Sequence, residues 1–283
     1  MEHQVSSSRE TRVEHVSDTS LMTAAGRAIE TARADGVIRD PLAEHLAGPR
    51  GAALAQTLYS PAWMGITVGL RSRVIDEMLT EAIAVHGIQV VMILGAGLDT
   101  RPYRLALPQA LRWIEVDLPG ILDYKSQLLA FEKPKCRLER IAADLTDATA
   151  RQAVFAAAGS HPGLILTEGL LLYLPASATE ALATEPVRLS GIRYWLLDVA
   201  ASILMRNAHR DHFDDVEKVR AKDRVQGQQI VDLVNRNGWR LIRRRTYTAE
   251  AFRIAASRGL EALPDSAAPP ADDPSGIYLF SQP

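Results

Sequence analysis

The spacing of hydrophobic residues changes near residue 87. Before that point, apolar side chains recur at nearly helical intervals over 68–85, and helix-forming residues fill 21–30, behind candidate N-caps at 17–19. Asp40-Pro41 indicates the start of another short helix, because proline suits the first helical position. The pattern therefore predicts a helical segment over residues 1–86.

From 87 to 200 the hydrophobic residues instead form short continuous runs. The run Val90–Leu94 ends in a glycine, as is typical of a strand buried on both faces. Similar runs follow at 113–117, 138–142, 164–167 and 194–199, with helical patterns between most of them. Strands that alternate with helices at this spacing predict an α/β fold with a doubly wound, parallel sheet.

The last part of the chain begins with a polar, charge-dense stretch at 206–224. We interpret this stretch either as a solvated helix or loop or as an insertion over the mouth of the sheet. Beyond it we expect a helix over 226–237 that ends at Gly238, strands at 239–247 and 277–281, and a loop over 264–274.

Composition places the chain among globular proteins. Its 283 residues are 47% hydrophobic and 23% charged, which excludes wholesale disorder and a fibrous repeat and allows one or two domains. The 32 basic and 34 acidic residues nearly balance, so neither a nucleic-acid partner nor a polybasic membrane-binding surface is expected.

Cysteine content and hydrophobicity bear on the compartment. The single cysteine, Cys136, cannot form an intrachain disulfide or a cysteine-based zinc site. Residues 1–16 lack the apolar segment of a signal peptide, and no apolar run approaches the ~18 residues of a membrane span. We therefore expect a cytoplasmic protein without a membrane segment; nothing in the sequence indicates its oligomeric state.

A turn containing two glycines, Gly95-Ala96-Gly97, follows the first predicted strand, and such a turn lets the backbone approach a ligand closely. Asp99 stands where a dinucleotide site has its third glycine, and a carboxylate suits a pyrophosphate poorly. Asp117, at the end of the second strand, is placed to bind ribose hydroxyls. The pattern favours an adenosine ligand without a phosphate chain, and hence S-adenosylmethionine over NAD.

Two more acids, Asp144 and Glu168, follow the third and fourth predicted strands. Since the carboxyl ends of parallel strands meet at one edge of a sheet, these acids and Asp117 are expected to converge there. Capping of the following helix is the alternative role for each acid. Their coincidence on a single edge favours a ligand site.

Several motifs resemble the signature of the leucine carboxyl methyltransferase superfamily. In the predicted sheet they are Gly95–Arg101, Tyr103–Leu105, Glu115–Pro119, Tyr124-Lys125, Asp144-Leu145 and Glu168–Leu174. Nearer the N-terminus, Asp18–Ser20, Arg27-Ala28, Arg39–Ala43 and Arg71–Asp76 resemble the bacterial branch, which includes O-methyltransferases of polyketides and other secondary metabolites. The motifs occur in order over about residues 17–240.

The resemblance implies a class I methyltransferase with a Rossmann-like, doubly wound sheet that is mostly parallel and has an antiparallel last strand. It also implies a helical cap at residues 1–86 and an S-adenosylmethionine-binding domain at 87–283, with a lid insertion at about 200–225. The stretch 200–225 and the tail from Tyr247 onward match no motif of the family, so the acceptor is left open.

The resemblance also implies S-adenosyl-L-methionine as the cofactor. By position, Gly95, Ala96 and Gly97 would line its amino-acid end. Arg71 would bind the methionine carboxylate, since a guanidinium fork matches a carboxylate, and Arg73 is its rival on the same helix.

The other side chains that the resemblance assigns to the cofactor follow strands. Asp117 would hold the ribose, with Leu118 beside it, and Asp144 with Leu145 would hold the adenine. Glu168 would lie near the ammonium group.

Four neighbouring side chains are expected to support this site. We expect Arg101 and Arg104 to form structural ion pairs that pack the first helix after the glycine turn. Tyr124 and Lys125 are expected to orient the loop of Asp117 rather than to react.

These observations predict an S-adenosylmethionine-dependent O-methyltransferase acting on a small-molecule carboxylate or hydroxyl, such as a polyketide. A carboxylate acceptor, with a pKa near ~4, is already ionised at neutral pH and needs no base. A phenol or alcohol needs one, and His209 and His212 in the expected lid are the candidates, with exposed surface histidines as the alternative. Their spacing forms no complete metal-ligand set, so no metal is expected.

Three other functions stay open. One is a protein C-terminal carboxyl methyltransferase, as in another branch of the same superfamily. The second is an NAD-type or nucleotide-sugar enzyme, which Asp99 disfavours. The third is a non-catalytic binding protein with a methyltransferase fold, which the presence of Gly95, Gly97, Asp117 and Asp144 disfavours.

Overall fold

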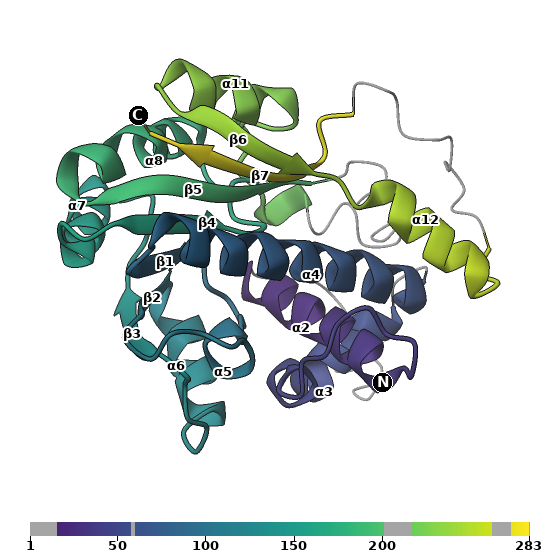
Figure 1. The fold of residues 1–283 in the computed structure, drawn as a ribbon. Helices are drawn as coiled ribbons and strands as arrows, with labels where there is room; N and C mark the ends of the chain where they lie inside the picture. The colour runs from purple at the N-terminus through teal and green to yellow at the C-terminus, as the bar shows by residue number, and fades with distance from the viewer. Residues whose placement is uncertain (1–15, 58–59, 201–216, 262–272, 283) are drawn as a thin grey trace, which may run out of the picture. The chain divides into compact units, whose positions relative to one another are not determined.

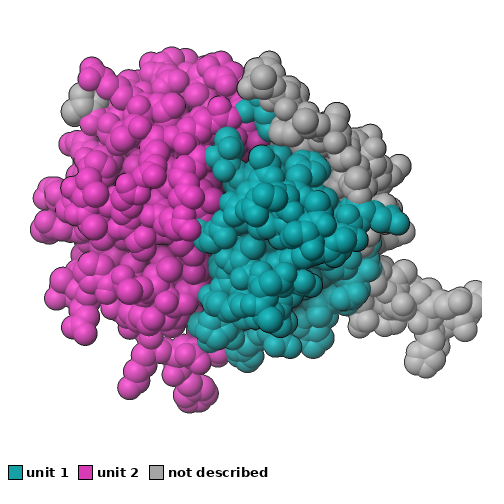
Figure 2. Space-filling view, turned by 45° about the vertical axis from the view of Figure 1, so that its right-hand side comes forward, with its two compact units in different colours: residues 1–73, 201–220, 246–273 teal, residues 74–200, 221–245, 274–283 magenta. Residues whose placement is uncertain are grey.

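The computed structural model describes residues 16–57, 60–200, 217–261 and 273–282. The chain divides into two compact units, which Figure 2 colours separately. Unit 1 comprises residues 1–73, 201–220 and 246–273, and unit 2 comprises residues 74–200, 221–245 and 274–283. The division into a cap at 1–86 and a sheet domain at 87–283 stays a prediction, and residues 201–216 of the expected lid lie outside the described residues.

Unit 2 is built on a seven-stranded sheet (Figure 1). Its strands are β1 (Val90–Leu94), β2 (Arg112–Asp117), β3 (Arg137–Ala142), β4 (Gly163–Thr167), β5 (Ile192–Val199), β6 (Arg240–Arg245) and β7 (Gly276–Ser281). They lie in the order β3-β2-β1-β4-β5-β7-β6, with β1 to β5 parallel and β7 antiparallel to both of its neighbours. The predicted α/β sheet with an antiparallel last strand is confirmed.

Burial explains why the central strands form. Every residue of β1 and of β4 is buried, as expected for strands with helices on both faces. The edge strand β6 is exposed along most of its length and has the sequence RLIRRR. Charged residues on an edge strand oppose pairing with the edge of another chain.

Helices cover both faces of the sheet. On one face, α7 (Ala148–Ala158), α8 (Ala176–Leu189) and α11 (Gln228–Arg236) share a hydrophobic core with alternate strand residues such as Ile114 and Val116. Glu115, between those two, points to the other face, where it meets α6 (Pro119–Leu128). The second half of α4 (Pro61–His86) lies on that face too, and His86 stacks on Tyr194 of β5 with ring centroids 4.5 Å apart.

The described part of unit 1 is helical. It contains α2 (Val16–Ala32), α3 (Ala43–Gln56), the first half of α4, and α12 (Thr248–Ser257). The fully buried Glu30 of α2 forms an ion pair of 2.7 Å with Arg258, which directly follows α12. The helices predicted at 21–30 and 68–85 are confirmed as parts of α2 and α4. Within the described ranges, none of the helices combines the length and the apolar character needed to cross a membrane.

We expect Cys136 to be unreactive while the protein is folded. Its side chain is buried, and burial, with a contribution from Glu115, raises the pKa of its thiol to about 11. Because the thiolate is the reactive form, an aromatic disulfide reagent at pH 8 should label the native protein about 100-fold more slowly than the urea-unfolded protein. The chain has one cysteine, so the label reports on this site alone. Equal labelling rates would show that the thiol is accessible in the native state.

Candidate functional site

The carboxyl ends of β2, β1 and β4 lie side by side. Leu94, the last residue of β1, pairs with Val116 of β2 on one side and with Thr167 of β4 on the other. The chain order of the strands reverses between β1 and β4, and in open α/β sheets such a switch point is where ligands bind. The turn Gly95-Ala96-Gly97 therefore leaves the sheet at the favoured position.

The glycines of this turn have backbone conformations that other residues avoid. Gly95 has a φ of 67° and Gly97 a φ of 46°. A Cβ on Gly95 would lie 2.8 Å from Cδ1 of Leu170, so a side chain there would force Leu170, in the segment after β4, to move. The N–H of Ala96 donates to the carbonyl of Val116 at 3.0 Å, which ties the turn to β2. The turn thus presents backbone, and not side chains, at the strand ends.

Asp117 is held against this turn. Its Oδ2 accepts the N–H of Gly97 at 2.6 Å, and its Oδ1 accepts the N–H of Leu118 at 2.7 Å. Burial raises the pKa of Asp117, and the two N–H donors act in the opposite direction. Each carboxylate oxygen has two lone pairs. Two hydrogen bonds therefore fix the carboxylate while leaving it the capacity to accept from the two hydroxyls of a diol.

The segment after β3 adjoins Asp117. The N–H of Ala143 donates to the carbonyl of Asp117 at 2.9 Å. Asp144 is exposed, and its Oδ1 accepts from the N–H and the hydroxyl of Thr146 at 2.8 and 2.7 Å. Leu145 is buried. The exposed Leu118 adds an apolar surface at the end of β2.

The alternative of helix capping does not describe these acids. The N-cap residue of α6 is Leu118, that of α7 is Asp147, and that of α8 is Pro175. The side chain of Asp147 accepts the N–H of Ala150 at 2.7 Å. The roles of Asp117, Asp144 and Glu168 toward a cofactor stay predictions.

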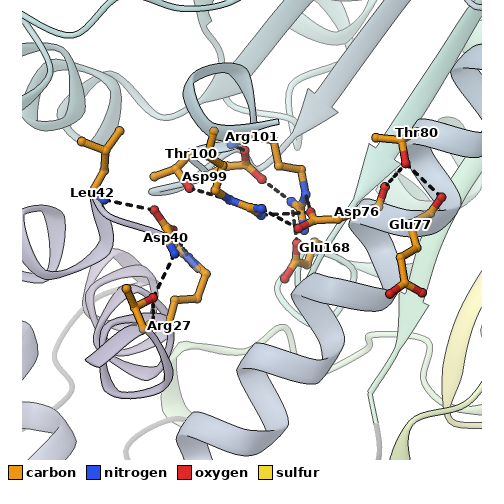
Figure 3. A network of polar contacts seen from close by, with 12 residues as sticks. Arg27, Asp40, Leu42, Asp76, Glu77, Thr80, Asp99, Thr100, Arg101 and Glu168 are labelled. Carbon is orange, nitrogen blue, oxygen red and sulfur yellow. Dashed lines mark hydrogen bonds and ion pairs between the residues drawn. The ribbon is translucent and has the colours of Figure 1, made fainter. Parts of the chain in front are cut away.

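Glu168, after β4, belongs to an ion-pair cluster centred on Arg101 (Figure 3). Arg101 is 2% exposed, and its Nη1 lies 2.9 Å from Oε2 of Glu168. Its Nε lies 2.6 Å from Oδ1 of Asp76 in α4, and Asp99 forms a third ion pair. Burial by itself would lower the pKa of Arg101, but Asp99, Glu168 and Asp76 raise it well above its ordinary value.

The supporting residues behave partly as expected. Arg101 and Arg104 form ion pairs, and Nη1 of Arg104 lies 2.5 Å from Oδ2 of Asp76. Lys125 acts on Asp117 through its charge, which works to lower the pKa of that carboxyl, but its ion-pair partner is in the strand. Its Nζ lies 2.7 Å from Oε1 of Glu115, inside β2, because α6 turns this side chain toward the sheet.

Two buried acids beside the candidate site were not predicted from the sequence. Asp76 lies within a motif of the family, but α4 and the strands are distant in sequence, so its pairing with Arg101 has no local signal. Asp198, in β5, accepts the N–H of Gly169 at 2.8 Å and so holds the residue next to Glu168. The sequence signal for Asp198 was its position as an acid near the end of a predicted strand.

The remaining predicted residues lie in other parts of the chain. Arg71 is half-buried in α4 and belongs to unit 1. Residues two positions apart on an α-helix are separated by about 200° around its axis, so Arg71 and Arg73 face different sides. Nη2 of Arg73 lies 2.7 Å from Oε1 of Glu250 in α12.

His209 and His212 lie outside the described residues. Within the described part of the chain, no group of three or more His, Cys, Asp or Glu could hold a metal ion.

Known proteins share the sequence patterns of this chain. The model of the leucine carboxyl methyltransferase family matches residues 20–185, more than half of the chain. A candidate S-adenosyl-L-methionine-dependent methyltransferase of Mycobacteroides abscessus is 38% identical over 191 residues, covering 63% of this chain and 61% of the relative. A protein of the same description from Mycobacterium tuberculosis is 35% identical over 196 residues, covering 63% and 64%. The chain spans about three fifths of the length of these curated relatives.

A solved structure is similar in fold. A DUF574 family protein from Streptomyces avermitilis has a TM-score of 0.57 and 13% sequence identity, over 92% of this chain and 97% of that protein. The sheet order and the antiparallel β7 confirm the class I methyltransferase fold that the motifs imply. By the extent of the family match, the chain belongs to the leucine carboxyl methyltransferase family.

Proposed function

We propose that this chain binds S-adenosyl-L-methionine at the carboxyl ends of β1 to β4 and transfers its methyl group to an oxygen atom of a small molecule. The observation that carries this proposal is the Asp117 carboxylate, fixed by the N–H groups of Gly97 and Leu118 beside the glycine turn. A carboxylate that is fixed next to exposed backbone can accept hydrogen bonds from the two hydroxyls of a ribose. The site can therefore bind an adenosine ligand that has no phosphate chain.

Each part of the cofactor has a proposed partner along this edge. The adenine would lie against Leu118 and Leu145, with Asp144 accepting from its amino group. The amino-acid end would cross the turn Gly95-Ala96-Gly97 toward Glu168. Arg71 would bind the methionine carboxylate, as family membership suggests.

The residues of the chain would act chiefly by binding and orienting. When bound, the cofactor supplies a methyl group on a sulfonium, which makes a neutral thioether the leaving group. Alignment of an acceptor oxygen with that methyl group and exclusion of water can each lower the barrier by several kcal/mol. A carboxylate acceptor, which the family's name favours, needs no base because it is ionised at neutral pH. For a hydroxyl acceptor, His209 or His212 would be the base.

The proposal extends to the setting of the reaction. We place the protein in the cytoplasm, in the methylation of secondary metabolites such as polyketides. The nearly balanced charge of the chain suits a small acceptor better than a nucleic acid. The family description also supports a second candidate, methylation of the C-terminal carboxylate of a protein.

A thermal shift measurement tests the cofactor. At 100 times its dissociation constant, the product S-adenosylhomocysteine should stabilise the fold by about 2.7 kcal/mol and raise the melting temperature, whereas NAD should leave it unchanged. A rise with NAD alone would overturn the cofactor assignment.

A mass-spectrometric screen tests the acceptor. Carboxylic acids, phenols and peptides with a free C-terminal leucine are incubated with S-adenosylmethionine, and products heavier by one methyl group are sought. Methylation confined to the peptides would replace the small-molecule proposal with the protein-tail candidate. Phenol methylation that is lost in His209→Ala or His212→Ala would assign the base and exclude the base-free route.

A further inference from the structure

Arg101 joins three acids from separate elements of unit 2. Asp76 comes from α4, Asp99 from the segment after the glycine turn, and Glu168 from the end of β4 (Figure 3). Asp99 is held twice, since its Oδ1 also accepts the backbone N–H of Arg101 at 2.7 Å. The guanidinium therefore links α4, the glycine-turn segment and β4.

The position of Glu168 connects this cluster with the ligand site. Leu94 pairs with Thr167, so Glu168 leaves the sheet beside Gly95. On the other side of the turn, Leu94 pairs with Val116, and Asp117 follows it. A ligand whose ribose binds Asp117 and whose chain crosses the turn therefore reaches Glu168 with its far end.

The charges of the cluster favour a cation at that end. Three carboxylates, those of Asp76, Asp99 and Glu168, face the two guanidinium groups of Arg101 and Arg104. In these named pairs the carboxylates outnumber the guanidinium groups by one, in surroundings where Arg101 is almost fully buried. Close to these carboxylates, an ammonium group at Glu168 would be attracted, whereas an anion there would be repelled.

We propose that Arg101 is a positioning residue, which fixes the Glu168 carboxylate beside the glycine turn so that it binds the ammonium group of the cofactor's amino-acid end. This inference rests on the proposed function. A guanidinium suits the task because it is planar and permanently charged, and its donors point in fixed directions toward several carboxylates at once. Without it, three carboxylates would repel one another, and Glu168 would turn away or become protonated.

The test compares two ligands that differ at the amino-acid end. S-adenosylhomocysteine carries that end, and 5′-methylthioadenosine has the same adenosine and thioether without it. In Arg101→Met, which keeps most of the volume and removes the charge, calorimetric titration should show S-adenosylhomocysteine binding about 10- to 100-fold more weakly. The affinity for 5′-methylthioadenosine should stay within about twofold of the wild-type value, because Asp117 is untouched.

Two further variants separate positioning from general loss of structure. Arg101→Lys keeps the charge but not the forked shape of the guanidinium group. It should therefore weaken the binding of S-adenosylhomocysteine less than Arg101→Met does, and leave the affinity for 5′-methylthioadenosine unchanged. Leu182→Ala removes buried side-chain volume from α8, outside the cluster, and should lower the melting temperature while leaving both affinities unchanged. If Arg101→Met does not fold, Arg101→Lys must show the same ligand selectivity.

The outcomes distinguish the inference from the function on which it rests. If the Arg101 variants bind both ligands more weakly by the same factor, Arg101 only stabilises the structure, and the positioning role is overturned. Unchanged binding of both ligands would overturn it as well. If the wild-type protein binds neither ligand, the proposed cofactor itself is wrong.

Discussion

Replacement of Asp117 by alanine should reduce the affinity for S-adenosylhomocysteine at least about 100-fold. The N–H groups of Gly97 and Leu118 fix the carboxylate in place, at 2.6 and 2.7 Å. The carboxylate is therefore oriented before the ligand arrives, and little ordering remains to be done on binding. Hydrogen bonds to a charged group contribute ~1.5–3 kcal/mol each, so the loss of two ribose contacts accounts for the expected factor.

Two variants make this result specific. Asp117→Asn keeps the size and one acceptor oxygen, so its affinity should fall between those of Asp117→Ala and the wild type. Asp123→Ala, on the exposed side of α6, removes a nearby carboxylate and should leave binding unchanged. Calorimetric titration gives the affinities, and melting curves without ligand check that each variant folds. An Asp117→Ala affinity within threefold of the wild type would refute the ribose role.

Local sequence predicts the strands well where burial alone forms them. The apolar run Val90–Leu94 ends at a glycine, and the observed β1 has the same bounds. β6 was expected over 239–247 but spans Arg240–Arg245. Trp239 is buried, and its indole N–H donates to the carbonyl of Ala183 in α8, while Tyr247 is the N-cap residue of α12. A contact with a distant segment lies at the first end of the strand, and the start of the next helix lies at the second, so the residues of the strand alone do not encode its bounds.

The acids at the strand ends could be predicted, but their partners could not. Asp117, Asp144 and Glu168 each follow a recognisable strand, and the pairing of β1 to β4 brings the ends together. Two of the three carboxylate partners of Arg101 lie 25 residues before it and 67 residues after it, at Asp76 and Glu168. A charged residue carries no sequence signal for which opposite charge it will meet, so such a cluster emerges only from the packed structure.

Replacement of Lys125 by methionine should lower the free energy of unfolding by about 3 kcal/mol. Its Nζ lies 2.7 Å from Oε1 of Glu115, and neither side chain has any exposed surface. Removal of one partner of a buried ion pair typically lowers stability by ~3–5 kcal/mol, because the other charge stays buried without compensation. Arg140 keeps a contact of 2.9 Å with Oε2 of Glu115, so the lower end of that range is expected. Urea denaturation of the wild type and the variant measures the difference.

The comparison with two other variants shows whether burial, and not ion pairing as such, causes this loss. Arg112→Met breaks a pair with Glu139 whose side chains are 28% and 44% exposed, so it should cost at most about 1 kcal/mol. The double variant Glu115→Leu with Lys125→Met removes both buried charges and should be more stable than Lys125→Met alone, since no carboxylate is then left without its ammonium. If Lys125→Met lowered the free energy of unfolding no more than Arg112→Met, the carboxylate of Glu115 would be solvated by water or paired with another cation in the variant. The site between β2 and α6 would then be open to solvent. Because Glu115 lies two residues before Asp117 on the same strand, such an opening of β2 should also be visible as weaker binding of S-adenosylhomocysteine.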